Sequence, residues 1–314
     1  MKSSLLITGG LGYVGSFTAK NFLERTKKKS LVIDNLSRGN NFAKKYSKYK
    51  ILDISNRSVK KIVEKEKIDI ILHLASFTCV RESIKHKRRY LRNYKSQIQF
   101  IKNIKNTNVK YFIFSSSLSV FEKNKFKKDL APYSMYKLKI EKYLKKISSP
   151  NFKVIILRYP NVIGSDPKGK LGERNSFISR IVPIFYKSII NKKKSVLYYD
   201  FKKKVYPCRN YMHVKDIAEI NLKIIKDIKK FKNKFYVFNL MSNREYTNFQ
   251  VMNTLSKILA IKPMFDIKQI SKKESINQYY KSKNDILKLI KYKIKYTNLK
   301  KILKSNTKWF KKIY

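Results

Sequence analysis

Cysteine, histidine and glycine are scarce in this sequence of 314 residues, which contains 2, 3 and 8 of them. Two cysteines cannot build a disulfide framework, and the three histidines lie far apart without metal-ligand spacing, so we expect no metal site. No apolar run approaches the roughly 20 residues that cross a bilayer, and the first residues lack the apolar stretch of a signal peptide. These absences predict a cytoplasmic protein with reduced thiols.

Acidic residues are also few: 20 Asp and Glu stand against 74 Lys and Arg, a formal net charge of +54. Such a charge attracts any polyanion, so binding to nucleic acid through a basic surface is one hypothesis. The alternative is coding bias, because Lys, Ile, Asn and Tyr are abundant together while Gly, Pro and Ala are scarce. The basic residues are scattered and no nucleic-acid-binding signature accompanies them, so we expect no specific nucleic-acid partner.

The pattern of apolar residues indicates the fold. Strands are predicted at residues 5–7, 30–34, 50–53, 68–74, 109–115 and 152–158, and helices at 17–23, 59–66, 90–104 and 133–147. Apolar strands that alternate with helices are typical of a parallel sheet covered on both faces. We therefore predict an α/β protein with a Rossmann-type, doubly wound sheet at residues 1–165, a strand at 235–240 that returns to it, and a smaller C-terminal lobe at 166–314.

Four of the eight glycines fall within seven positions, at Gly9, Gly10, Gly12 and Gly15. They follow the first strand and precede the first helix, where glycine permits a tight turn and close approach of the backbone to a pyrophosphate. The next strand ends at Asp34, whose carboxylate would accept hydrogen bonds from ribose hydroxyls and favour NAD over NADP. Arg38 nearby weakens that preference slightly. The arrangement predicts a dinucleotide site.

Tyr133 and Lys137 are candidates for the chemistry. Their spacing places them on one helical face, although several of the 22 tyrosines would have a basic residue four positions on by chance. What favours this pair is its place after Pro132, at a helix start that follows the serine-rich stretch 115–119 at the end of the fifth strand. Beside the lysine ammonium and a nicotinamide, the pKa of Tyr133 would fall, and its phenolate could take a proton from a sugar hydroxyl while hydride leaves the same carbon.

Further segments follow one another along nearly the whole chain in the order typical of one protein family. By these segments the chain resembles the extended short-chain dehydrogenase/reductases. Within them it is most similar to the NAD-dependent epimerase/dehydratase family and its UDP-glucose 4-epimerases. The segments that carry the resemblance, besides those above, are Asp34–Ser37, Asp53–Ile54, His73–Ala75, Phe114–Ser117, Leu157–Asn161, Asp166–Gly169, Arg209–Val214 and Val237–Leu240.

The resemblance implies tightly held NAD and a UDP-sugar substrate, bound by the lobe at 166–314, that passes through a transient 4-keto sugar. Tyr133 would remove the proton of the 4-hydroxyl, Lys137 would hold the nicotinamide ribose, and Ser117 would hydrogen-bond the reacting oxygen. Asn161 and Arg209 would hold the UDP portion. The implied cofactor contacts are Gly9, Gly12, Tyr13, Val14, Gly15, Asp34, Asn35, Asp53, Ile54, Leu74, Ala75, Asn93, Ser115, Tyr133 and Lys137.

The sequence also departs from the family pattern. Thr78 stands where family members commonly have a lysine, and Arg81 stands where they have a glycine. Pro160 replaces the aromatic residue that usually precedes Asn161. An Arg-Pro-Gly-Asp signature that helps to bind the nucleotide appears only as residues 272–275, Lys-Lys-Glu-Ser. These changes indicate a diverged substrate, or uridine contacts made by other basic residues.

Several functions stay open. Leu118 and Ser119 replace the acid pair of 4,6-dehydratases, so dehydration is not expected. Tyr279 stands where related epimerases use a small residue to admit an N-acetyl group, which favours UDP-glucose and UDP-galactose over N-acetylated sugars. A simple NAD-dependent nucleotide-sugar dehydrogenase or reductase would need the same Tyr and Lys. An inactive Rossmann-like protein that binds polyanions is the alternative from another class.

The helices at 90–104 and 133–147 form the dimer interface in relatives, so the resemblance implies a homodimer. Repulsion between the lysines of their exposed faces would weaken it. These lysines are Lys139, Lys142, Lys145 and Lys146.

Overall fold

The structure is a computed structural model that describes residues 4–122, 125–126, 130–174, 180–270 and 285–314. The longer helices are α1 (Tyr13–Thr26), α2 (Ser58–Lys65), α4 (Lys87–Lys105), α5 (Pro132–Ile147), α6 (Ile181–Ile190), α7 (Val214–Lys226) and α8 (Asn248–Leu259). The shorter ones are η1 (Asn41–Tyr46), α3 (Val80–Lys85), η2 (Leu118–Val120), η3 (Ile228–Lys230), α9 (Asp285–Leu289), α10 (Leu299–Lys304) and α11 (Thr307–Ile313).

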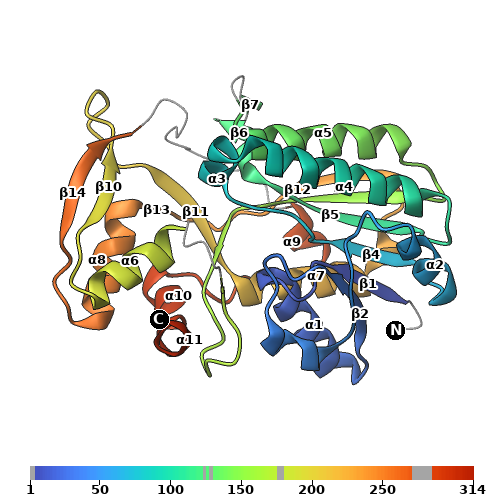
Figure 1. Ribbon diagram of the computed structural model, residues 1–314, viewed down its shortest axis with the longest axis horizontal. Helices are drawn as coiled ribbons and strands as arrows, with labels where there is room; N and C mark the ends of the chain where they lie inside the picture. Colours follow the sequence, from blue (N-terminus) through green and yellow to red (C-terminus); the bar gives the residue numbers. More distant parts are fainter. Residues whose placement is uncertain (1–3, 123–124, 127–129, 175–179, 271–284) are drawn as a thin grey trace.

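The large sheet has seven strands in the order β12-β8-β5-β4-β1-β2-β3, and every pairing is parallel (Figure 1). These strands are β1 (Leu5–Thr8), β2 (Ser30–Asp34), β3 (Ser47–Ile51), β4 (Ile70–His73), β5 (Tyr111–Ser117), β8 (Lys153–Tyr159) and β12 (Phe235–Asn239). The predicted Rossmann-type sheet, with its returning strand at 235–240, is confirmed. β3 begins three residues before its predicted start: it lies at the sheet edge with four exposed residues, so no apolar run marks where it begins. β5 is shifted by two residues toward the C-terminus.

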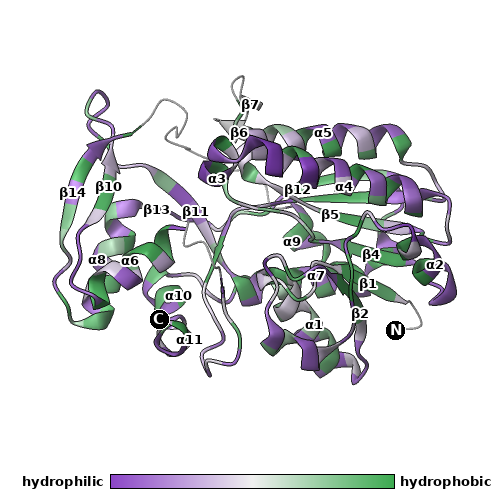
Figure 2. Ribbon diagram, viewed as in Figure 1, coloured by the Kyte–Doolittle hydropathy of each residue, from purple (hydrophilic) through white to green (hydrophobic). Residues whose placement is uncertain are grey.

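Alternate residues of each strand enter two different cores, one on each face of the sheet. In β1, Leu5 and Ile7 pack in the core that α1 and α7 cover, whereas Leu6 packs in the core below α2, α4 and α5. Figure 2 shows the strands as mostly hydrophobic and the outer faces of the helices as hydrophilic. Burial on both sides explains why these strands read as continuous apolar runs.

A second, smaller unit follows in the chain, built around its own core. Its strands are β9 (Asn161–Ile163), β10 (Ser195–Tyr199), β11 (Cys208–His213), β13 (Glu245–Thr247) and β14 (Phe265–Gln269); the remaining short pair is β6 (Phe121–Glu122) with β7 (Lys125–Phe126). Helices α6, α8, α10 and α11 pack around Tyr186 and the fully buried Trp309. Because α7, α9 and β12 pack with the large sheet, segments beyond residue 165 contribute to both units. The division near residue 165 remains our proposal.

Helix α5 is tied to the large sheet through one buried carboxylate. Arg158 on β8 donates to Glu141 through Nε at 3.0 Å and Nη2 at 2.5 Å, and Ser116 on β5 donates to the same carboxylate. Both charged residues are buried. Glu141 lies four and eight residues after Lys137 and Tyr133, on the same helical face, so this ion pair fixes how that face meets the carboxyl end of the sheet.

Replacing Glu141 by glutamine is expected to lower the free energy of unfolding by about 3 kcal/mol, because Arg158 would keep a buried charge without its partner. Urea unfolding of both proteins measures this difference. The exposed pair of Lys60 and Glu64, 3.8 Å apart, provides the control: Glu64→Gln should cost less than about 0.5 kcal/mol. Equal losses in the two variants would contradict an anchoring role for Glu141.

Candidate active site

A cavity of about 950 Å³ lies at the carboxyl ends of the large sheet and extends to residues of the smaller unit. The residues to which the resemblance gives a role in cofactor binding, substrate binding or chemistry line it. They are Gly9, Gly12, Tyr13, Val14, Gly15, Asp34, Asn35, Asp53, Ile54, Leu74, Ala75, Asn93, Ser115, Ser117, Tyr133, Lys137, Asn161 and Arg209. Their common location is a finding; their individual roles remain predictions.

The glycine turn is closed by backbone contacts that exclude side chains. Gly9 has a φ of +67°, and a Cβ on it would lie 2.7 Å from the backbone nitrogen of Ala75. A Cβ on Gly15 would lie 2.3 Å from the carbonyl oxygen of Gly9. Gly12 caps α1 without a side-chain hydrogen bond, so N–H groups of the first turn stay available to an anion. The turn fits a pyrophosphate.

Asp34 ties this turn to the loop that follows β2. Its carboxylate accepts hydrogen bonds from the backbone N–H of Leu11 at 3.0 Å and of Leu36 at 2.8 Å. Burial raises the pKa of Asp34 although these amides oppose the shift. The side chain is therefore held rigidly at the cavity wall, where a ribose hydroxyl can share it.

Asp53 stands at the adenine end of the predicted cofactor path. Partial burial acts to raise its pKa, but hydrogen bonds from Ser55 and from Asn35, the latter at 2.8 Å, outweigh burial and lower the pKa. Farther along, Asn93 accepts from the backbone N–H of Phe77 at 3.3 Å. The first of these contacts links the loops after β2 and β3, and the second links the loop after β4 to α4.

The reacting groups gather where β5 meets α5. Lys137 Nζ donates to the carbonyl oxygen of Ser115 at 2.8 Å and is buried. Burial lowers the pKa of Lys137 to about 7, while Glu141 opposes the shift. Tyr133 is 7% exposed and lies on the same helical face. Ser117 Oγ accepts from the backbone N–H of Ser119 at 3.1 Å, so its hydroxyl can donate to a ligand.

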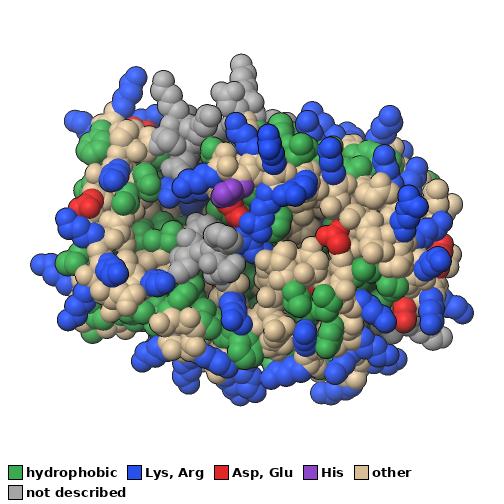
Figure 3. All heavy atoms as spheres, in the orientation of Figure 1, with side chains coloured by type: hydrophobic (Ala, Val, Ile, Leu, Met, Phe, Trp, Pro, Cys, Tyr) green, Lys and Arg blue, Asp and Glu red, His purple; other side chains and the backbone are tan. Residues whose placement is uncertain are grey.

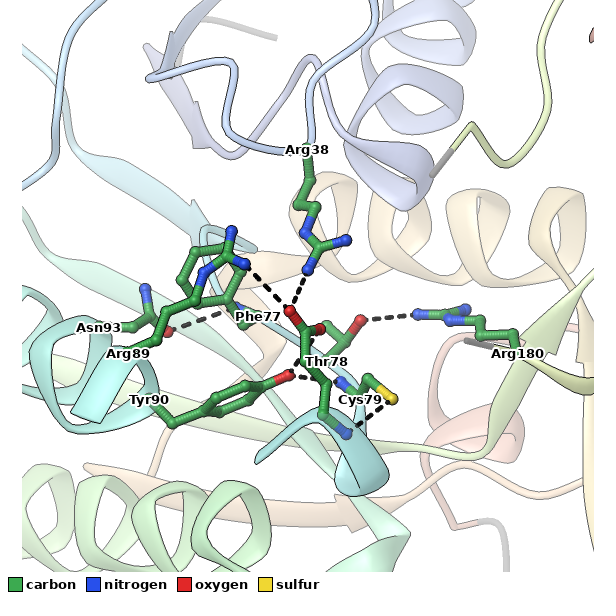
Figure 4. A network of polar contacts seen from close by, with 9 residues as sticks. Arg38, Phe77, Thr78, Cys79, Arg89, Tyr90, Asn93 and Arg180 are labelled. Carbon is green, nitrogen blue, oxygen red and sulfur yellow. Dashed lines mark hydrogen bonds and ion pairs between the residues drawn. The ribbon is translucent and has the colours of Figure 1, made fainter. Parts of the chain in front are cut away.

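A buried carboxylate on α3 organises the loop after β4, a feature the sequence did not reveal. Glu82 pairs with Arg38 at 2.5 Å and with Arg89 at 3.2 Å, and it accepts from Tyr90 Oη at 3.2 Å. Figure 4 shows the side chains of Arg38, Arg89 and Tyr90 pointing toward one another. The two guanidinium groups lie over the ring of Phe77, at 5.5 and 4.3 Å from its centre. Arg38, which we had expected to weaken the preference for NAD, therefore points to Glu82.

Arg180, immediately before α6, was also missed. Its guanidinium pairs with Glu173 at 3.0 Å through Nε and donates to Thr78 Oγ1 at 2.8 Å and to the carbonyl oxygen of Val162 at 3.3 Å. Figure 4 shows it reaching toward Thr78 in the loop after β4. In the opposite direction, the guanidinium of Arg81 lies 4.3 Å from the ring centre of Tyr198. The departures Thr78 and Arg81 are thus both contact points across the cavity.

The remaining predicted substrate ligands lie on β9 and β11. Asn161 Nδ2 donates to the carbonyl oxygen of Asn210 at 3.3 Å, and Arg209 Nη1 donates to that of Cys208 at 2.7 Å. Pro160 also lines the cavity. The expectations for residues 272–275 and for Tyr279 lie outside the described residues.

Across the described parts of the chain, we find no cluster of three or more His, Cys, Asp or Glu side chains that could hold a metal ion. His73 and His213 are buried, and burial lowers the pKa of each to about 3. The helices described here are all too short or too polar to span a bilayer.

Comparison with known proteins agrees with this geometry. UDP-glucose 4-epimerase of Lactobacillus helveticus is 30% identical over 273 residues, which cover 82% of each chain. That of Yersinia enterocolitica is 29% identical over 289 residues, covering 84% of this chain and 85% of the relative.

Solved structures extend the likeness over the whole chain. UDP-glucose 4-epimerase from Bifidobacterium longum, in complex with NAD+ and UDP, superposes with a TM-score of 0.89 at 23% identity, covering 99% of this chain and 98% of that one. The UDP-Glc/GlcNAc 4-epimerase of Campylobacter jejuni gives 0.79 at 28% identity, with 99% of both chains covered. A model of the NAD dependent epimerase/dehydratase family matches residues 5–240, from the first strand of the sheet to the end of the returning strand. Because that match spans the glycine turn, the serine strand and the helix of Tyr133 alike, the chain belongs to the NAD-dependent epimerase/dehydratase family.

Proposed function

We propose that this protein is an NAD-dependent 4-epimerase of a UDP-sugar that interconverts UDP-glucose and UDP-galactose. The observation that carries the proposal is the convergence of Tyr133, Lys137 and Ser117 in one cavity that the glycine turn and Arg209 also line. The names of the relatives supply UDP-glucose, and UDP-galactose is its 4-epimer.

The residues present fit NAD. The turn at Gly9 and Gly15 has no room for side chains, and the open N-terminus of α1 offers N–H donors to a pyrophosphate. Asp34 would accept hydrogen bonds from the adenosine ribose. When bound, NAD would accept a hydride from C4 of the sugar and return it.

The side chains of the protein would handle the proton and hold the sugar. Tyr133 would take the proton of the 4-hydroxyl and give it back. Ser117, whose oxygen is already engaged as an acceptor, would donate to the reacting oxygen and hold it near the phenol. Asn161 and Arg209 would hold the UDP portion, the arginine through charge-assisted hydrogen bonds to the diphosphate.

Three further proposals concern the cellular location, the oligomeric state and the binding partners of the protein. We infer a cytoplasmic protein, a homodimer, and no specific nucleic-acid partner. The packing of α4 against α5 on one side of the sheet supports the second, because the resemblance places the dimer there (Figure 1). A monomer in sedimentation at micromolar concentration and physiological salt would exclude it. Binding to nucleic acid that persists as salt is raised would exclude the third.

The test of the function is an assay of the purified protein with UDP-galactose, together with analysis of nucleotide released on denaturation. Released NAD with formation of UDP-glucose would establish the activity. NAD without interconversion would direct the assay to UDP-N-acetylglucosamine and to reductase chemistry. Failure to hold or bind any NAD would exclude the proposal.

Tyr133→Phe is expected to lower kcat by about 100-fold or more, since the phenol is the proposed proton acceptor. Steady-state rates with UDP-galactose measure this loss. Tyr136→Phe is the matched control: Tyr136 lies on the same helix but stacks on Tyr94 at 4.8 Å, so its rate should stay within about twofold of the unchanged protein. An equally active Tyr133 variant would remove the phenol from the mechanism.

Lys137→Met should change activity and stability in opposite directions. Burial lowers the pKa of Lys137 to about 7, below that of an unfolded lysine, so its charged form opposes folding and stability rises from pH 7 toward 10. An apolar side chain of similar length should add roughly 1–4 kcal/mol to the free energy of unfolding at pH 7 and flatten that pH dependence, while turnover falls. Urea unfolding of cofactor-stripped protein at several pH values decides the point; a destabilised variant would contradict it.

A further inference from the structure

Arginine is rare in this chain, with 12 residues against 62 lysines. Figure 3 shows basic side chains spread over the visible face. The two types of basic residue are nevertheless not equally represented in the lining of the cavity. Of the lysines that the structure describes, only Lys137 and Lys194 line it, whereas seven of the twelve arginines do. These are Arg38, Arg81, Arg89, Arg92, Arg174, Arg180 and Arg209.

Coding bias would scatter both residue types alike, so the contrast has a physical reason. A buried lysine gives up its proton readily, but a guanidinium keeps its charge and offers five N–H donors in a fixed plane. Lys137 shows the first effect, because burial lowers its pKa to about 7. Its positive charge therefore fades above neutral pH, when Tyr133 most needs a cation beside it.

Arg180 is held in a fixed orientation within this cavity. Glu173 forms an ion pair with its Nε, while the Nη nitrogens donate to Thr78 and to the carbonyl oxygen of Val162. The carboxylate thus lies on one edge of the guanidinium, and the loop after β4 lies on another. These described residues use three of its five N–H donors.

A short chain of contacts leads from Arg180 to Tyr133. Beside Thr78, the backbone N–H of Cys79 donates to Tyr90 Oη at 3.1 Å, and the Tyr90 ring lies edge-on to that of Tyr133 at 6.4 Å. Burial acts to lower the pKa of Arg180, but attraction to Glu173 and then to the two phenols of Tyr13 and Tyr133 raises it. Arg180 and Tyr133 also line the same cavity, so their charges can act on each other across it.

The charges around Tyr133 come from each element that surrounds it. Lys137 lies on α5, where Glu141 opposes the loss of its proton. Glu82 of α3 lies next to Tyr90 of α4 and is already paired with two arginines. Arg180 precedes α6 and is paired with Glu173. Among these, Lys137 and Arg180 are the cations that act on the phenol, and only the second keeps its charge across the pH range in which an enzyme works.

We propose that Arg180 is a permanent cation that stabilises the phenolate form of Tyr133 from the segment of the cavity wall that precedes α6. It is a positioning residue that acts through Tyr133. The assignment rests on the proposed function only in taking Tyr133 as the base. Because Arg180 precedes α6 of the smaller unit, the strength of this base depends on how that unit sits against the loop of Thr78.

The experiment is a pH titration of the NAD-bound protein by phenolate difference absorbance, with Tyr133→Phe as the reference that isolates this one tyrosine. Arg180→Gln should raise the midpoint by about one pH unit, and Arg180→Lys should raise it less. Glu173→Gln, which removes the opposing carboxylate, should lower it. Arg174→Gln removes another cavity guanidinium, one that lies 6.0 Å from the ring of Phe42, and should leave the midpoint unchanged.

Opposite shifts from Arg180→Gln and Glu173→Gln would support the proposal, because a purely structural role would move both variants in one direction. Unchanged midpoints, or shifts of one sign, would overturn it. Should Arg180→Gln fail to fold, Arg180→Lys and Glu173→Gln still decide. The titration needs no sugar, so it separates this inference from the proposed function: an enzyme that turns over no UDP-sugar can still show the shifts. Where turnover is found, the acid limb of kcat/KM against pH should move by the same amounts.

Discussion

The ion pair between Glu141 and Arg158 is the contact on which the geometry of the cavity depends. A helix that packs on a sheet can rotate about its axis, and apolar contacts alone do not fix that angle. Arg158 and Ser116, on neighbouring strands, donate to one carboxylate on α5. These bonds fix the rotation of the helix and therefore the direction of the face that bears Tyr133 and Lys137. The same carboxylate opposes the loss of the Lys137 proton. One buried interaction therefore sets both the position and part of the charge of the reacting groups.

The composition of the chain makes its exceptions informative. A sequence this poor in glycine keeps four of them in one turn, and there a Cβ would strike backbone at Gly9 or Gly15. A sequence this rich in lysine keeps arginine around one cavity. The composition of the chain disfavours both glycine and arginine. Glycine persists in the turn because no other residue lacks a side chain, and arginine persists around the cavity because its charge survives burial.

The sequence predicted the parts of the fold that burial determines. Six strands and their helices were recognisable because both faces of the sheet are covered, while β3 at the edge and the short, polar α3 carry no periodic signal. The cavity wall built from motifs was also foreseen, although the roles of its residues remain predictions. What could not be foreseen are pairs such as Arg180 and Thr78, 102 residues apart, since no local pattern encodes a contact between loops. The rarity of arginine was the available signal.

The smaller unit reaches the cavity through its own core. Trp309, fully buried on α11, donates its indole N–H to the carbonyl oxygen of Glu173 at 2.8 Å. Its ring also lies so close to Gly172 that a Cβ there would approach within 2.3 Å. The backbone at Glu173 is therefore set by the packing of a C-terminal helix, and the carboxylate of Glu173 in turn holds Arg180. Residues near the end of the chain thus help to determine the charge that faces Tyr133, although none of them touches the site.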